Sequence, residues 1–199
     1  MTYDPLISRG VSSMLPAANS YWHATHKPPT LPPLNKKVNT EYLVIGGGYT
    51  GLSAAITLAQ AKQEVTLLDA NSPGFGCAGR NGGFILSGSG RLSLSAIEDK
   101  WGRDIAKAMQ GEFDGAVHLL KQRIADFDMQ VDLVEGPYLK LAHNPKQAEL
   151  LCASAKHLES HFNVPSSPLS EKDLIARFGI EGAYGGVELK GACLHPLKL

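Results

Sequence analysis

The spacing of apolar and polar positions is most regular between residues 41 and 69, where it predicts a strand, a helix and a second strand. Residues 42–45 form a short apolar run, and apolar side chains then recur at helical spacing through residues 50–61. A second apolar run, residues 64–68, follows directly. A connection of this length returns in the same direction, so we expect two parallel strands joined by a crossover helix.

Further along the chain, the pattern predicts helices and then a second group of strands. Residues 93–128 carry apolar side chains at three- and four-residue steps, with a break or kink near Gly102 or Gly111. Residues 131–143 have the character of strands around a turn or bulge at Gly136–Pro137.

Polar and turn-forming residues predict where the remaining elements begin. Asn144, followed by proline, is a helix N-cap, and Ser170 opens a further short helix. The turn-rich residues 182–194 favour a hairpin, and residues 195–199 resemble the first turn of a helix with Pro196 at its first position.

The turn after the first strand carries the G-x-G-x-x-G template, with glycines at Gly46, Gly48 and Gly51. The first glycine permits a tight turn, the second lets a pyrophosphate approach the main chain, and the third lets the helix pack closely on the strand. The helix N-terminus then attracts the anion without a lysine, and the missing lysine argues against a P-loop. A turn that is only closely packed would explain Gly51 but not Gly48.

An acidic residue completes this dinucleotide-binding pattern. Asp69 ends the second predicted strand, 18 residues after Gly51. A carboxylate at this place accepts hydrogen bonds from the ribose hydroxyls of an adenosine and repels a 2′-phosphate, which disfavours NADP. The pattern alone does not separate NAD from FAD.

A glycine-dense loop follows Asp69, and together with the preceding motif it resembles a known protein family. The segments IGGGYTGLSAA, LLDA and GFGCAGRNGGF resemble the N-terminal part of the D-amino-acid-oxidase-like superfamily of FAD-dependent oxidoreductases, most closely its gamma-glutamylputrescine-oxidising members. In that family the loop wraps the flavin; Ala78 replaces the family's serine. The resemblance implies FAD as cofactor. The candidate cofactor-binding residues are Gly46, Gly48, Tyr49, Thr50, Gly51, Asp69, Ala70, Ala78, Gly79, Arg80, Asn81, Gly82 and Gly83.

The resemblance also implies an activity and a fold. The activity is oxidation of the C–N bond of an amine or amino-acid-like substrate, with oxygen as acceptor. The alternative is a non-catalytic module that binds NAD or FAD. No catalytic residue is identified, and His195 is either an active-site or a structural residue.

The fold is α/β: an extended arm (1–40, with four prolines in 23–39), an FAD-binding Rossmann-like region (41–130), and the start of a substrate-side α+β region (131–199). We expect the chain to be an N-terminal fragment of a longer oxidoreductase.

Composition excludes several other classes of protein. Lys plus Arg equals Asp plus Glu at 19 each, so the chain has no net charge that would favour nucleic acid. No apolar run approaches the ~20 residues that span a bilayer, and the N-terminus lacks the apolar segment of a signal peptide. The three cysteines are widely spaced, which fits reduced thiols in the cytoplasm. His23 and His26 lack further ligands nearby, so we expect no metal site.

Overall fold

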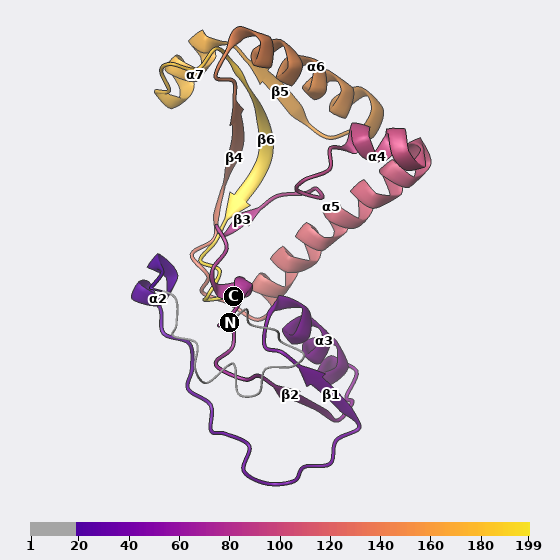
Figure 1. Cartoon of the computed structure of the whole chain (residues 1–199), viewed down its shortest axis with the longest axis vertical. Coiled ribbons are helices and arrows are strands. Elements are labelled where there is room, and N and C mark those ends of the chain that lie inside the picture. The colour runs from indigo at the N-terminus through magenta and orange to yellow at the C-terminus, as the bar shows by residue number, and fades with distance from the viewer. Residues whose placement is uncertain (1–18) are drawn as a thin grey trace, which may run out of the picture. The chain divides into compact units, whose positions relative to one another are not determined.

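The computed structural model describes residues 19–199, and the chain forms two compact units (Figure 1). Among the described residues, the first unit contains residues 19–83 and 195–199, and the second contains residues 84–194. The first eighteen residues of the expected N-terminal arm lie outside the described residues. The three-part domain division made from the sequence stays a prediction.

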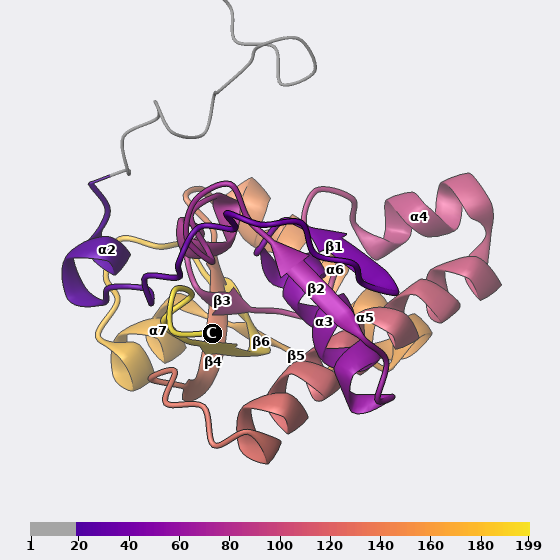
Figure 2. The ribbon, with the colours of Figure 1, turned by 90° about the horizontal axis from the view of Figure 1, so that it is seen from below.

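The first unit contains the parallel strand–helix–strand motif that the apolar pattern predicts. Strand β1 (Tyr42–Ile45) leads into helix α3 (Tyr49–Gln60), and β2 (Val65–Leu68) follows. The strands pair in parallel from Tyr42 opposite Val65 to Ile45 opposite Leu68. Helix α3 packs against both strands, as Figure 2 shows. The α/β fold class is therefore confirmed.

The arm before β1 is partly helical. Helix α2 (Tyr21–Thr25) is capped by Ser20, whose hydroxyl accepts a hydrogen bond from the His23 backbone. The chain has no helix or strand from residue 26 to residue 41. The expectation of an extended arm was therefore wrong for residues 21–25, where a polar cap starts one helical turn despite the prolines that follow.

The second unit contains an antiparallel sheet of four strands. These are β3 (Phe84–Ile85), β4 (Val134–Leu141), β5 (Ser166–Leu169) and β6 (Gly186–Cys193). Strand β6 pairs with each of the other three. The predicted hairpin in residues 182–194 was wrong, because those residues supply one long strand whose partners lie elsewhere in the sequence. The expected turn or bulge at Gly136–Pro137 was also wrong: both residues pair in register within β4, an edge strand that tolerates a proline.

Four helices complete the second unit. Helices α4 (Leu94–Trp101) and α5 (Arg103–Asp126) are separated at Gly102, whose φ of 90° ends one helix before the next begins. The predicted break at Gly102 is confirmed, whereas Gly111 lies inside α5. Helix α6 (Pro145–Phe162) starts at the Asn144 cap, and α7 (Glu171–Phe178) starts at a capping box on Ser170, as predicted.

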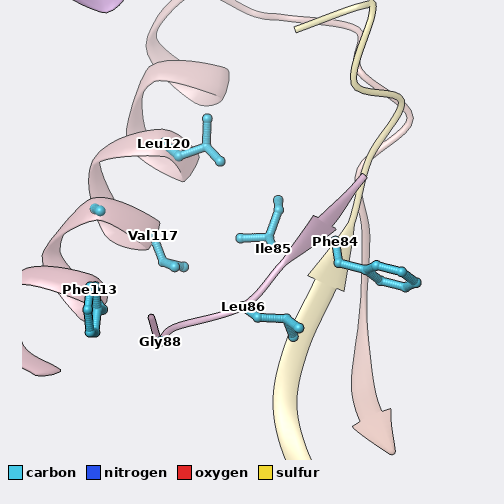
Figure 3. Close-up of a pocket in the computed structure, with 8 residues that line it drawn as sticks. Phe84, Ile85, Leu86, Gly88, Phe113, Val117 and Leu120 are labelled. Carbon is cyan, nitrogen blue, oxygen red and sulfur yellow. The ribbon is translucent and has the colours of Figure 1, made fainter. Parts of the chain in front are cut away.

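Buried apolar side chains hold these elements together in two clusters. One joins α4, α5 and α6 through Leu94, Ile97, Ala106 and Phe162, and the other joins Leu169, Leu174 and Ala183. A cavity of about 250 Å³ lies between β3 and α5 in the same unit (Figure 3). Its lining side chains are apolar, so we assign it no chemistry.

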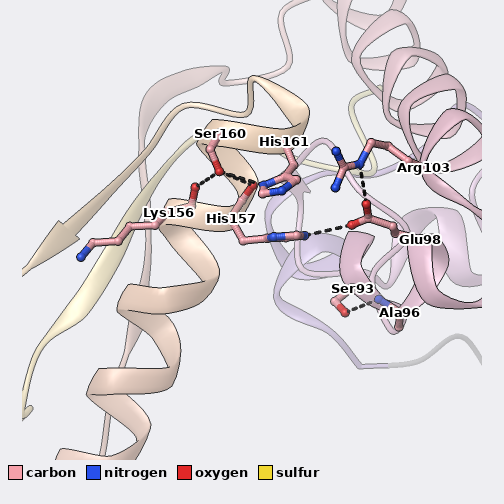
Figure 4. Close-up of polar contacts among 8 residues, drawn as sticks. All are labelled: Ser93, Ala96, Glu98, Arg103, Lys156, His157, Ser160 and His161. Atoms are coloured by element: carbon pink, nitrogen blue, oxygen red, sulfur yellow. Dashed lines mark hydrogen bonds and ion pairs between the residues drawn. The ribbon is translucent and has the colours of Figure 1, made fainter.

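A charged contact links α4 to α6 (Figure 4). One oxygen of Glu98 lies 2.6 Å from Nε of Arg103, and the other lies 3.1 Å from Nε2 of His157. The His161 ring stacks on His157 at 4.2 Å between centroids. The Arg103 hydrogen bond, with smaller contributions from the charge of Arg103 and from His157, holds the pKa of Glu98 below its usual value.

Because the pKa of this carboxylate is lowered in the folded protein, the free energy of unfolding depends on pH in the acidic range. The contribution of Glu98 is fully present above the ordinary glutamate pKa of about 4.3 and is lost as the pH falls through the lowered pKa. We expect Glu98→Gln to reduce the loss of unfolding free energy between pH 5 and pH 3, measured by denaturant titration at each pH. Glu135→Gln is the control, because its ion pair with Lys121 is exposed. Equal acid profiles for wild type and Glu98→Gln would contradict the assignment.

Candidate cofactor-binding site

A cavity of about 510 Å³ lies over the glycine turn at the carboxyl end of β1. One wall is the turn and the first residues of α3, and the other is formed by Asp69 and residues of the loop that follows β2. Ligands of open α/β sheets bind outside the carboxyl ends of the strands. The position of the cavity is therefore the one that a dinucleotide requires.

Each of the three template glycines is explained by a different feature of the structure. Gly46 has a φ of 107°, which a side chain disfavours. A Cβ on Gly51 would lie 1.9 Å from the carbonyl oxygen of Gly46, so close packing of helix on strand requires this glycine. A Cβ on Gly48 would meet nothing nearer than the Cβ of Ala78 at 3.9 Å. The protein itself thus leaves room for a side chain at Gly48.

The start of α3 is arranged to attract an anion. Gly48 is the N-cap residue, and no side chain caps the helix there. The backbone N–H groups of the first turn therefore lack a side-chain acceptor and carry the positive end of the helix dipole toward the cavity. This geometry suits a phosphate or pyrophosphate without a nearby lysine.

The Asp69 carboxylate lines the cavity and also ties two backbone segments together. Its Oδ2 accepts a hydrogen bond of 2.6 Å from the Gly47 backbone, and its Oδ1 accepts one of 2.7 Å from the Asn71 backbone. The first bond links the glycine turn to the end of β2. Each carboxylate oxygen has a second lone pair, so these bonds leave acceptor capacity for a ribose hydroxyl.

Tyr49 and Asn81 both line the cavity and are hydrogen-bonded to each other. The Tyr49 hydroxyl donates to the Pro196 carbonyl at 2.9 Å and accepts from the Asn81 side chain at 3.2 Å. Burial raises the pKa of Tyr49, and the Asn81 hydrogen bond opposes that shift in part. Tyr49 therefore lines the site as a neutral hydroxyl whose hydrogen bonds go to the protein.

Gly79 and Arg80, two of the predicted loop residues, lie outside the lining. A Cβ on Gly79 would lie 2.3 Å from the Gly74 carbonyl oxygen, so packing alone requires this glycine. The Arg80 guanidinium lies over the Phe75 ring, 4.7 Å from its centroid. Their expected contacts with the flavin stay predictions.

The structure brings most of the predicted residues together around the cavity. The predicted residues that line it are Gly46, Gly48, Tyr49, Thr50, Gly51, Asp69, Ala78 and Asn81. Those that do not are Ala70, Gly79, Arg80, Gly82 and Gly83. Lining residues that the sequence reasoning missed are Ile45, Gly47, Phe75, Gly76 and Cys77. Each of these five residues is a neighbour of a template or loop position in the sequence, and this adjacency could have identified them as lining residues.

His195 is buried among residues of α2. Its Nε2 lies 3.0 Å from the Thr25 hydroxyl, and its Nδ1 accepts a hydrogen bond from the Leu197 backbone at 3.3 Å. The Trp22 ring packs edge-on against it at 4.8 Å between centroids. These contacts favour the structural alternative for His195. Residues 196–198 form a hydrogen-bonded turn rather than the start of a helix.

Two features of the described residues bear on function. Within residues 19–199, no three His, Cys, Asp or Glu side chains are grouped so that they could bind a metal ion. The helices in this same range all lack the combination of length and apolar character that a membrane crossing requires.

Comparisons with known proteins agree with the geometry of the cavity. Residues 41–199 match the family model described as FAD dependent oxidoreductase (DAO). The chain is 33% identical over 168 residues to the gamma-glutamylputrescine oxidoreductase of Escherichia coli, a match that covers 83% of this chain and 39% of the relative. It is 27% identical to the probable oxidoreductase OrdL of Haemophilus influenzae, covering 89% of this chain and 41% of the relative. The chain thus spans about two fifths of these curated relatives.

Solved structures support the fold at lower identity. Glycine oxidase from Geobacillus kaustophilus superposes with a TM-score of 0.60 at 16% identity, over 80% of this chain and 41% of that chain. L-proline dehydrogenase from P. horikoshii superposes with a TM-score of 0.56 at 18% identity, over 80% and 39% respectively. The arrangement of elements is therefore that of the N-terminal parts of these proteins.

Proposed function

Because the chain belongs to the DAO family of FAD-dependent oxidoreductases, we propose that the cavity over Gly48 binds FAD. The pyrophosphate lies at the N-terminus of α3, where the backbone N–H groups and the helix dipole receive it. The adenosine ribose lies against Asp69, whose carboxylate accepts hydrogen bonds from its hydroxyls.

The observation that carries this proposal is the open space at Gly48. Packing and backbone angle account for Gly51 and Gly46, but nothing in the protein lies close enough to exclude a side chain at Gly48. A group that approaches the main chain at this point explains the glycine. A turn that served packing alone would not need it.

We further propose that the enzyme oxidises the C–N bond of an amine or amino-acid-like substrate, with oxygen as acceptor. The flavin, when bound, is the two-electron acceptor: it takes up a hydride equivalent from the carbon atom next to the substrate nitrogen. Support comes from the relative named gamma-glutamylputrescine oxidoreductase, which suggests a substrate of that type. Since the chain spans about two fifths of that relative, both activity and substrate are proposals about the whole enzyme.

The residues of this chain hold and orient the cofactor in this proposal. The first turn of α3 receives negative charge, Asp69 fixes the adenosine half, and the loop containing Ala78 and Asn81 closes one side of the cavity. These groups set where the cofactor lies. We assign none of them a proton transfer.

A flavin spectrum and a substrate screen test the proposal. The purified full-length protein should show the visible absorption of oxidised flavin, and with this cofactor it should release peroxide with one class of amines. The screen compares gamma-glutamyl amines, polyamines, sarcosine, glycine and D-amino acids. Flavin binding without peroxide from any of these favours the non-catalytic module, and absence of flavin uptake rejects the FAD proposal.

Replacement of Asp69 should weaken the cofactor complex. Asp69→Ala removes the acceptor for the ribose hydroxyls, so we expect FAD affinity to fall by ~1.5–3 kcal/mol, the range for a charge-assisted hydrogen bond. It also leaves the buried Gly47 N–H without its 2.6 Å partner, which lowers the unfolding free energy by about 1–3 kcal/mol. Titration of apoprotein with FAD and denaturant unfolding measure the two effects separately.

Asp69→Asn separates the two roles of the carboxylate. It keeps one acceptor oxygen of similar size but removes the charge, so stability should recover more than affinity does. If Asp69→Ala lost stability while its FAD affinity stayed at the wild-type value, the carboxylate would serve the backbone alone.

The thiols support a proposal about the compartment. Cys77, Cys152 and Cys193 are all unpaired in the structure. Unpaired cysteines are typical of reducing compartments. We therefore propose a cytoplasmic location, which fractionation of cells that express the native gene would test.

A further inference from the structure

Asn81 has an unusually complete set of hydrogen bonds for a loop residue beside a cavity. Its Nδ2 lies 2.8 Å from the Ala78 carbonyl oxygen and 3.2 Å from that of Cys77, and its Oδ1 accepts from the Gly83 backbone at 2.8 Å. The carbonyl partners need a donor and the Gly83 N–H needs an acceptor. The side-chain amide therefore fits in one orientation, and it closes the loop on itself.

The same residue connects this loop to distant parts of the unit. The indole N–H of Trp22, in α2, donates to the Asn81 carbonyl oxygen at 2.8 Å. The Asn81 amide also donates to the Tyr49 hydroxyl, which in turn donates to the Pro196 carbonyl. Trp22 contacts His195, so the contacts form a closed ring through α2, the loop, the start of α3 and the residues around Pro196.

This ring borders the proposed cofactor site. Tyr49, Cys77, Ala78 and Asn81 all line the cavity. The Asn81–Tyr49 bond ties the loop to the first residue of α3, and the Gly74 N–H bond to the Gly47 carbonyl oxygen ties it to the glycine turn. Trp22 and Pro196 hold the two sides of the Asn81–Tyr49 contact from outside the lining.

We propose that Asn81 is a positioning residue for the cofactor: it holds the 77–83 loop at the distance from α3 that FAD requires. This inference rests on the proposed FAD function. The amide has two N–H groups, and three protein oxygens already share them. No N–H of this side chain remains for a direct bond to FAD, so its effect passes through the loop.

The test compares FAD affinity in a variant that removes the bonds of the Asn81 side chain and in one that removes the Trp22 bond to the Asn81 backbone carbonyl. Asn81→Ala should raise the Kd for FAD about 3- to 10-fold, the range for loss of net hydrogen bonding in a folded protein. Trp22→Phe keeps an aromatic ring against His195 but removes the N–H donor, and it should raise the Kd about 2- to 5-fold. The double variant should bind less weakly than the product of the two effects, because both act on one loop.

Asn163→Ala serves as the matched control. Asn163 ends α6 in the second unit with a φ of 53°, so its replacement lowers stability without touching the loop. We expect a lower unfolding midpoint and the wild-type Kd for FAD. This control separates positioning of the cofactor from a general loss of stability.

Three results would overturn the inference in different ways. A wild-type Kd in Asn81→Ala would show that the loop needs no such positioning, with the FAD proposal intact. A weakened Asn81→Ala beside an unaffected Trp22→Phe would show that the contact with α2 takes no part in holding the loop. Failure of the wild-type protein to bind FAD would reject the proposed function, and the inference with it.

Discussion

Gly48→Val is expected to abolish FAD binding in a protein that still folds. A Cβ at this position has open space on the protein side, with its nearest neighbour at 3.9 Å. The backbone angles of Gly48, φ −87° and ψ 179°, are also those that a valine adopts readily. The branched side chain would instead occupy the place of the pyrophosphate, so we expect affinity to fall at least about 100-fold. Flavin absorption per mole of purified protein measures the loss.

Unfolding of the same variant provides the control. Exchange of glycine for valine at a helix N-cap should cost about 0.5–2 kcal/mol, because glycine is favoured over valine at this position. Gly48→Ala should bind FAD with intermediate affinity, since it adds one carbon instead of three. A folded Gly48→Val protein that retains one flavin per chain would reject the placement of the pyrophosphate at this turn.

The glycine turn could be predicted from the sequence because its requirements are local. The positive φ of Gly46 and the contact between Gly51 and the Gly46 carbonyl arise within one turn of chain. Neighbouring residues fix such geometry whatever the rest of the protein does. The parallel pairing of β1 with β2 follows from the length of the crossover for the same reason.

The loop after Asp69 was harder to predict, because its contacts come from distant residues. The sequence made Gly79 a candidate cofactor-binding residue, whereas a Cβ there would lie 2.6 Å from Cδ1 of Leu197, so packing also requires this glycine. Tyr49 likewise reaches Pro196, and Trp22 reaches Asn81. No periodicity in the sequence reports contacts of this kind.

The pairing of strands in the second sheet was also hard to predict from the sequence. The glycines of residues 182–191 suggested a hairpin, yet β6 runs unbroken and pairs with β4 along its whole length. A Cβ on Gly186 would lie 2.6 Å from the Lys140 carbonyl oxygen, and one on Gly191 would lie 3.0 Å from the Tyr138 Cβ. These glycines allow close approach of β4 rather than a turn. Pattern alone does not distinguish the two uses of glycine.

Gly51→Ala should destabilise the first unit strongly. The new Cβ would lie 1.9 Å from the Gly46 carbonyl oxygen and 3.3 Å from a methyl carbon of Val44. The first of these atoms belongs to the backbone of the turn, so it cannot rotate away as a flexible side chain would. We expect the unfolding free energy to fall by about 3 kcal/mol or more, at the upper end of the cost of overpacking. Denaturant unfolding followed by circular dichroism measures the change.

Gly111→Ala is the matched control, because it makes the same chemical change with the opposite expected sign. Gly111 lies on the exposed surface of α5, and a Cβ there meets nothing within 4 Å. Alanine favours the helix over glycine by about 0.8–1.0 kcal/mol, so this variant should be more stable than wild type. If both variants gained stability, helix α3 would lie further from β1 in solution than the Gly46–Gly51 contact requires. The third template glycine would then need a ligand, rather than packing, to explain it.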